Sequence, residues 1–166
     1  IPDLVWLKDA QCLYRTCNAH FERFCGLKEY DIVGKGTDAI ATVEMAECAR
    51  VADAAAMAAS EPVVTEEWLD SLATGYRGLF ELTRVAMRDH DGEVVGVLGI
   101  AHDISARRRA EEALAESRTL LQAVVDTVPM RVFWKDRNLR YLGCNPAFAR
   151  DAGKTSSSEL IGQDDF

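Results

Sequence analysis

The sequence contains no long apolar run and no secretory leader. Its apolar stretches are far shorter than the ~20 residues that a helix needs to cross a bilayer. These absences argue against membrane contact by this segment and favour a cytoplasmic location. The chain begins at Ile1, directly in strand-like sequence, so we expect it to be an excerpt from a longer protein.

Basic residues are scarce relative to acidic ones. The chain has 19 Lys and Arg against 27 Asp and Glu, which gives a formal net charge of −8. Because phosphate backbones are bound by basic faces, nucleic acid is not an expected partner. The one basic cluster, residues 107–109, is followed at once by Glu111 and Glu112, and we interpret it as a solvated helix face.

Catalytic and metal-binding motifs are also missing. No nucleophile elbow, P-loop, HExxH or kinase signature occurs, so we expect no enzyme and no metal site within this chain. The cysteines are odd in number and form no CxxC pair, which fits a reducing compartment better than a disulfide framework. They are Cys12, Cys17, Cys25, Cys48 and Cys144.

The sequence repeats itself. Residues 1–26 align without gaps on residues 128–153, and ten of the 26 pairs are identical, where composition alone gives roughly two. The identical pairs include Asp9 with Asp136, Tyr14 with Tyr141, and Asn18 with Asn145. Since this spacing is too long for a solenoid repeat, it indicates a tandem of whole domains, with residues 128–166 as the beginning of the second.

Hydrophobic patterning predicts an α+β domain over residues 1–105. Strands are expected at 5–9, 13–17, 63–72, 79–88 and 94–104. Helices are expected at 19–25, 29–33 and 38–59. Asn18 is the expected N-cap of the first helix, Gly26 its end, and Thr74-Gly75 and Asp91-Gly92 are expected hairpin turns. This order predicts a five-stranded antiparallel sheet with helices on one face.

The last predicted strand, residues 94–104, is apolar on both faces. An antiparallel sheet usually shows one polar face to water, and the helices can cover only one face of this sheet. The second apolar face therefore predicts a further partner, either a flanking helix or a second subunit.

These motifs, in this order, resemble those of PAS domains. The similar stretches are VWLKD, YRTCNAHFERFCG, EYDIVGK, EEWLDSL, MRDHDGEVVGVLGI, and the DIS that precedes ARRRAEEAL. The resemblance covers residues 1–105, and residues 128–166 resemble the first third of another PAS domain. It implies a non-catalytic sensory or dimerisation module of a bacterial signalling protein. The output domain of the same polypeptide, often a histidine kinase or a diguanylate cyclase, would lie outside this segment.

A short joint, Asp103-Ile104-Ser105, couples the last strand to a charged helix predicted over residues 106–127, about 33 Å long. Ser105 is a favourable N-cap residue. We expect the joint to pass movement of the strand to the helix. The resemblance implies that Asp103 pairs with a basic residue, and an equally open role is to cap nearby backbone donors. The candidate partners are Arg84, Arg107 and Arg108.

The predicted helix carries a sparse apolar stripe that is suited to pairing with a second copy. The expected dimer seam consists of Ala110, Leu114, Ser117, Leu121 and Val124. A second seam, through Ala113 and Leu120, is rotated from it by about 50°. The alternative is an inert spacer whose stripe packs on its own sheet.

The resemblance also bears on cofactors, and none is expected. Light-sensing PAS domains place a reactive cysteine in an Asn-Cys-Arg-Phe-Leu-Gln stretch, which this chain lacks, so flavin is not expected. Haem-binding members use a histidine on the long helix before the third strand, and residues 44–59 contain none. We interpret His20, His90 and His102 as surface or structural residues.

PAS domains usually enclose a pocket between the helices and the sheet. The candidate lining residues are Trp6, Phe21, Phe24, Trp68 and Phe80. The same aromatic residues also fit an ordinary core. A small-molecule receptor, whose pocket ligand sets the signalling state, is therefore the alternative function. A small enzyme would need polar groups converging on the pocket, and the sequence does not single out such a set.

Overall fold

The computed structural model describes residues 2–164. The chain divides into two compact units, with the boundary after Arg108. Within the described residues, no helix combines the length and the apolar character that a membrane span requires.

The first unit is built on a five-stranded antiparallel sheet in the order β2-β1-β5-β4-β3. The strands are β1 (Leu4–Asp9), β2 (Tyr14–Cys17), β3 (Val63–Asp70), β4 (Arg77–Arg88) and β5 (Val94–Asp103). β1 pairs with both β2 and β5, so the two ends of the domain meet in the middle of the sheet. The predicted antiparallel sheet is confirmed, with strand ends shifted by one or two residues.

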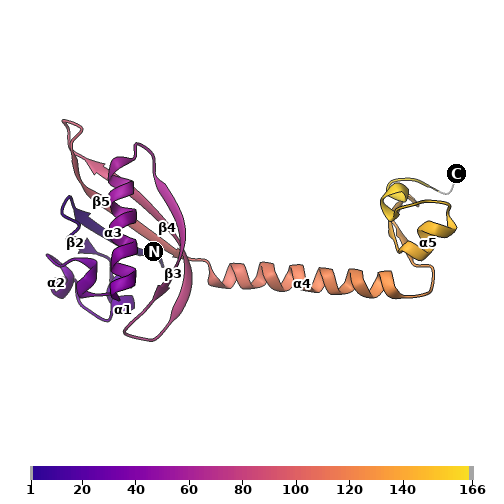
Figure 1. Ribbon diagram of the computed structural model, residues 1–166, viewed down its shortest axis with the longest axis horizontal. Coiled ribbons are helices and arrows are strands. Elements are labelled where there is room, and N and C mark those ends of the chain that lie inside the picture. The colour runs from indigo at the N-terminus through magenta and orange to yellow at the C-terminus, as the bar shows by residue number, and fades with distance from the viewer. Residues whose placement is uncertain (1, 165–166) are drawn as a thin grey trace. The chain divides into compact units, whose positions relative to one another are not determined.

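The helices lie between β2 and β3 in the chain. They are α1 (Ala19–Cys25), α2 (Glu29–Ile32), the 3₁₀ helix η1 (Thr37–Ala39) and α3 (Val43–Ala58). Figure 1 shows α3 lying across the sheet, and it contacts β3, β4 and β5. The helices therefore occupy one face of the sheet, as predicted.

The prediction of one continuous helix over residues 38–59 is wrong. The backbone of Thr42 is extended, and its hydroxyl accepts a hydrogen bond from the backbone N–H of Met45 (3.3 Å), so α3 begins only at Val43. A threonine hydroxyl that caps a helix competes with helix continuation. The segment before it forms the separate turn η1.

Asn18 does more than cap α1. Its side-chain oxygen accepts hydrogen bonds from the backbone N–H groups of Phe21 (2.9 Å) and Val5 (3.2 Å), while its amide nitrogen donates to the Asp3 carbonyl (2.8 Å). One side chain thus fixes α1 against β1. Gly26 ends the helix in the left-handed conformation (φ 72°), as expected for a C-terminal glycine.

The hairpin turns are confirmed at Gly75 and Gly92, which have φ values of 69° and 85°. In the second turn, the Asp89 carboxylate accepts hydrogen bonds from the backbone N–H groups of Asp91 and Glu93. Asp89, His90 and Asp91 lie close enough together to hold an ion, but all three are exposed. Their observed contacts are those of a turn.

The core of the first unit lies between the helices and the inner face of the sheet. Its buried members are Leu4, Trp6, Tyr14, Phe21, Ile32, Phe80, Leu82 and Ala101. Gly99 of β5 allows the Trp6 indole to lie directly on the strand, since a Cβ at this position would stand 2.2 Å from Trp6 Cε2. The outer-face residues Leu98 and Ile100 are half-buried, and their expected partner stays a prediction.

The second unit contains a short antiparallel pair, β6 (Phe133–Lys135) and β7 (Tyr141–Cys144). It is followed by α5 (Pro146–Asp151) and the 3₁₀ helix η2 (Ser157–Leu160). α4 (Ser105–Thr127) contains the boundary between the units. The small core of the second unit consists of Tyr141, Cys144, Ala149 and Leu160.

The sequence repeat is also a repeat of local geometry. Asn145 accepts hydrogen bonds from the backbone N–H groups of Val132 (3.1 Å) and Phe148 (3.0 Å) and donates to the Met130 carbonyl (2.7 Å). Asn18 makes the corresponding three bonds 127 positions earlier. The residues that the two copies share are therefore those that hold the opening strand pair on its first helix.

Candidate functional site

The joint between β5 and α4 is bonded to the neighbouring strand β4. The Ser105 hydroxyl oxygen accepts a hydrogen bond from the Leu79 N–H (2.8 Å), and the Ile104 N–H donates to the Leu79 carbonyl (2.9 Å). The Asp103 carboxylate accepts from the Ser105 N–H (2.9 Å) and from the Tyr76 hydroxyl. The base of α4 is therefore anchored to β4 as well as to the strand that precedes it.

Two of the expected partners of Asp103, Arg84 and Arg108, form ion pairs with other acidic residues. Arg84 pairs with Asp53 and Glu67, and Arg108 pairs with Glu66 of β3 (Nη2 to Oε2, 2.5 Å). The capping role of Asp103 is observed directly, since its carboxylate bonds the first backbone N–H of α4. The contact of Arg108 gives α4 a further attachment, to β3.

α4 begins one residue earlier than predicted. Ser105 is its first residue, and the Ile104 carbonyl accepts the first helical hydrogen bond, from the Arg108 N–H (2.9 Å). Ile104 is also buried. Its burial ties the residue that precedes α4 to the interior of the first unit.

The five residues of the predicted seam all lie on α4 and are exposed. Leu114 is 72 % exposed and Leu121 is 63 % exposed. Exposed leucines at this spacing are the feature on which the expected pairing rests, and the pairing itself stays a prediction.

A cavity of about 860 Å³ lies between α3 and the inner face of the sheet. Four of the five predicted aromatic residues line it, namely Trp6, Phe21, Phe24 and Trp68. Phe80 packs in the core against Phe24, with ring centroids 5.6 Å apart. The volume lies within the range of small-molecule sites.

A charged cluster, which sequence reasoning missed, lies in the wall of this cavity. Lys8, Asp53 and Arg84 line it and are each 2 % exposed or less. Lys8 Nζ donates to Asp53 Oδ2 (2.5 Å) and to Thr37 Oγ1 (2.7 Å). Arg84 Nε faces Asp53 Oδ1 at 3.3 Å as an ion pair, without the geometry of a hydrogen bond.

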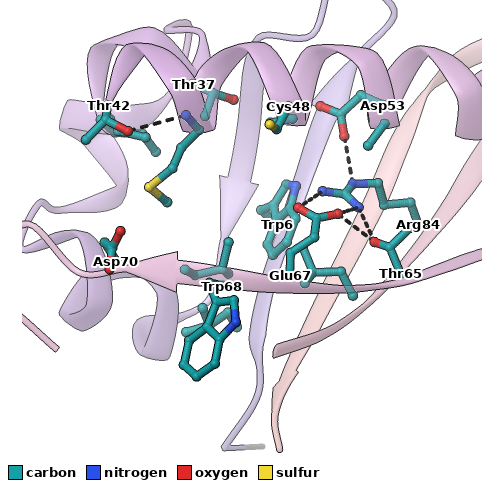
Figure 2. A pocket seen from close by; sticks show the side chains of 18 of the residues that line it. Trp6, Thr37, Thr42, Cys48, Asp53, Thr65, Glu67, Trp68, Asp70 and Arg84 are labelled. Atoms are coloured by element: carbon teal, nitrogen blue, oxygen red, sulfur yellow. Dashed lines mark hydrogen bonds and ion pairs between the residues drawn. The ribbon is translucent and has the colours of Figure 1, made fainter. Parts of the chain in front are cut away.

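Glu67 of β3 completes the cluster. Arg84 Nη1 donates to Glu67 Oε1 (2.9 Å) and Nη2 to Glu67 Oε2 (3.4 Å), so the guanidinium holds both carboxylate oxygens. Figure 2 shows Arg84 between Asp53 on α3 and Glu67 on the strand. Burial alone would raise the pKa of the Glu67 carboxyl, but hydrogen bonds from Arg84 and Thr65 and the charge of Arg84 lower it below its usual range.

The sequence carries a partial signal for the cluster. Lys8 lies in the same strand phase as the buried residues Leu4 and Trp6, and Arg84 lies in phase with Leu82. Asp53 is an acid within an alanine-rich helix. The strand pattern shows that Lys8 and Arg84 point inward. It does not show their common partner, because Asp53 lies on a helix 45 positions after Lys8.

One buried donor in the cavity wall has no partner. Trp6 Nε1 makes no hydrogen bond within the described part of the chain, although the residue is only 6 % exposed. An unpaired buried donor is costly, and it is commonly explained by water or a ligand.

Comparison with known proteins identifies the fold. The family model described as the PAS fold matches residues 1–109. The PAS domain of a Colwellia psychrerythraea protein superimposes with a TM-score of 0.54 at 20 % identity, covering 64 % of this chain and 89 % of that one. The chain belongs to the PAS fold family.

Two curated proteins are similar over most of the chain. The methanogenesis regulatory histidine kinase FilI of Methanothrix harundinacea (strain 6Ac) is 31 % identical over 73 % of this chain. The aerobic respiration control sensor protein ArcB of Escherichia coli (strain K12) is 25 % identical over 76 %. The chain spans only 13 % of the first and 16 % of the second. It is a PAS sensory domain similar to regions of sensor kinases.

Proposed function

We propose that this chain is the non-catalytic sensory and dimerisation module of a bacterial signal-transduction protein. In this proposal the output domain, a histidine kinase or a diguanylate cyclase, belongs to the same polypeptide, and the segment is cytoplasmic. The similarity to FilI and ArcB supports the kinase context.

The signal passes from the sheet to α4 through Asp103, Ile104 and Ser105. The observation that carries this proposal is the double attachment of the joint, to β5 through the chain and to β4 through Leu79. Because both bonds join the joint to one residue of β4, a shift of β4 along β5 moves the base of α4 with it.

α4 delivers the signal by pairing with the same helix of a second copy. The proposed seam is Ala110, Leu114, Ser117, Leu121 and Val124. Rotation of the helix to the seam through Leu120 provides a second state. Because both seams are similarly sparse, the free energies of the two paired states differ by only a few kcal/mol, as a switch requires.

The second unit is proposed to be the beginning of another PAS domain. The repeated hydrogen bonds of Asn18 and Asn145 support this assignment. In a tandem of this kind, α4 would connect two sensory domains.

A small-molecule receptor is the second candidate function. The cavity of about 860 Å³ and the unpaired Trp6 donor favour it. In this case a bound metabolite sets the positions of the strands to which the joint is attached.

Disulfide crosslinking tests the dimer seam. Leu114→Cys, Ser117→Cys and Leu120→Cys are introduced singly, with Thr119→Cys as a matched control that faces away from both seams. Each is made in a Cys48→Ser background, because Cys48 is the exposed native cysteine among the five. Burial raises the pKa of the Cys17 thiol to about 11 and that of Cys25 to about 12, which suppresses their reaction at neutral pH.

Ser117→Cys is expected to crosslink in either state, while Leu114→Cys and Leu120→Cys report the two seams separately. Thr119→Cys is expected to form no crosslink. Failure of all three seam positions to crosslink in solution would remove the dimer from the proposal.

A further inference from the structure

We propose that the cavity binds a carboxylate with an apolar tail, and that the ligand carboxylate replaces Glu67 on the Arg84 guanidinium. The inference rests on the receptor function above and names the chemical class of its ligand.

Arg84 is held in place from one side. Its Nε faces the Asp53 carboxylate at 3.3 Å, and Asp53 is itself fixed by Lys8 at 2.5 Å. All three side chains are almost completely buried. The two terminal nitrogens of the guanidinium are thereby presented as a fork, the arrangement that binds a carboxylate through both oxygens.

Glu67 is the exchangeable partner of this fork. Its side chain is 26 % exposed, against 1 % for Asp53, and it belongs to β3, which lies at the edge of the sheet. Its outer position allows its own charge to move into water. Asp53 cannot do so, because it also neutralises Lys8.

Charge balance favours an acid over a neutral ligand. When one carboxylate replaces another on Arg84, the buried guanidinium stays neutralised throughout the exchange. A neutral molecule that displaced Glu67 would leave Arg84 with one carboxylate fewer in a buried site, which is unfavourable. The internal Glu67 carboxylate thus marks the position of the ligand carboxylate.

The rest of the cavity suits an apolar tail. Its lining includes Leu4, Phe21, Phe24, Ile40, Met45 and Leu82. The Arg84 fork together with this apolar part of the wall fits an amphiphilic acid.

Exchange at Glu67 also reaches α4. Glu67 and Glu66 are neighbours on β3, where successive side chains point to opposite faces. Glu66 holds Arg108, in the first turn of α4, at 2.5 Å. Release of Glu67 therefore changes the restraint on the strand that anchors the helix.

The test is a calorimetric titration of the chain with sodium octanoate and, separately, with 1-octanol, which has the same tail and no charge. The proteins are the wild type, Glu67→Gln, Arg84→Gln and the control Glu66→Gln. Octanoate is expected to bind the wild type more tightly than octanol. Glu67→Gln removes the competing charge and is expected to tighten octanoate binding by about tenfold without changing octanol binding.

Arg84→Gln is expected to abolish the preference for octanoate, and Glu66→Gln to leave both affinities unchanged. If Arg84→Gln fails to fold, the Glu67→Gln result decides alone. Three results would overturn the inference. The wild type could bind octanoate and octanol equally, Glu67→Gln could leave the octanoate affinity unchanged, or neither the wild type nor Glu67→Gln could bind octanoate. Equal binding of octanoate and octanol would still support a small-molecule receptor. The proposed dimer and signal relay are tested separately, by the crosslinking of α4.

Discussion

At the scale of single residues, Asp53 pairs with two buried bases at once. Lys8 and Arg84 both depend on it, at 2.5 Å and 3.3 Å. Removing one partner from a buried ion pair leaves an uncompensated charge in the interior. Asp53 is therefore the single acid on which the folded cluster depends most.

We predict that Asp53→Ala destabilises the first unit by about 3–5 kcal/mol, the range for breaking a buried ion pair. Urea denaturation followed by circular dichroism measures the change. Glu47→Ala, which removes a fully exposed pair with Arg50 on the same helix, serves as the control and is expected to change little. Similar losses in the two variants would contradict the proposed importance of the buried cluster.

Glu67 predicts a dependence of stability on pH. Its pKa is lower in the folded protein than in the unfolded chain. Its contribution is therefore complete above the unfolded value of about 4.3 and is lost as the pH falls through the folded pKa. The stability difference between wild type and Glu67→Gln should be largest near neutral pH and should shrink in acid.

Denaturation of the two proteins at a series of pH values between neutral and acidic checks this. A stability difference that is constant over the whole series would show that Glu67 is not held as a carboxylate by Arg84.

Sequence reasoning found the aromatic lining of the cavity but not its charges. Trp6 follows from hydrophobicity and strand phase, and Phe21 from its hydrophobicity on the first helix. Lys8 and Arg84 are charged residues in inward positions, and that phase alone marks them as unusual. Their pairing through Asp53 depends on how α3 lies on the sheet, which local patterns do not specify.

At the scale of elements, the joint between β5 and α4 is where the sheet and the helix are mechanically connected. Ser105 belongs to the helix but bonds the backbone of β4. The sequence predicted a short joint. It did not predict the attachment to Leu79, because that contact depends on the register between β4 and β5.

We predict that Ser105→Ala leaves the Leu79 N–H without its acceptor and destabilises the joint by about 1–3 kcal/mol. Amide hydrogen exchange should become faster at Leu79 and in the first turn of α4. Ser105→Thr keeps a hydroxyl and should preserve the slow exchange. Thr119→Ala, on the side of the same helix that faces away from both seams, is the second control.

If Ser105→Ala exchanges no faster than Ser105→Thr at Leu79, the hydroxyl does not hold the joint. The signal would then have to reach α4 by another contact, such as the pair between Arg108 and Glu66.

Helix boundaries show where local patterns were sufficient. Asn18 and Gly26 delimited α1 correctly because each is specific for one end of a helix. The break at Thr42 was missed because alanine-rich sequence on its far side favours helix, and the cap acts through a single hydroxyl.

At the scale of the whole molecule, the sequence repeat predicted two related units, and the structure gives two compact units with the same opening hydrogen bonds. Residues such as Asn18 and Asn145 repeat because they hold backbone groups that are common to both copies. The outer face of the sheet and the exposed stripe of α4 are the two apolar surfaces for which a partner is expected, and that partner stays a prediction.

The account depends centrally on α4 pairing with a second copy. We predict that the wild-type chain sediments as a dimer whose population rises with concentration. Leu114→Asp combined with Leu121→Asp places charges in the seam and should yield monomers, while Thr119→Asp, facing away, should leave the dimer intact.

Sedimentation equilibrium of these three proteins over a wide range of concentrations is the most direct test. A concentration-dependent dimer that only the Leu114→Asp/Leu121→Asp variant loses is the predicted result. A wild-type chain that stays monomeric at every concentration would contradict the account.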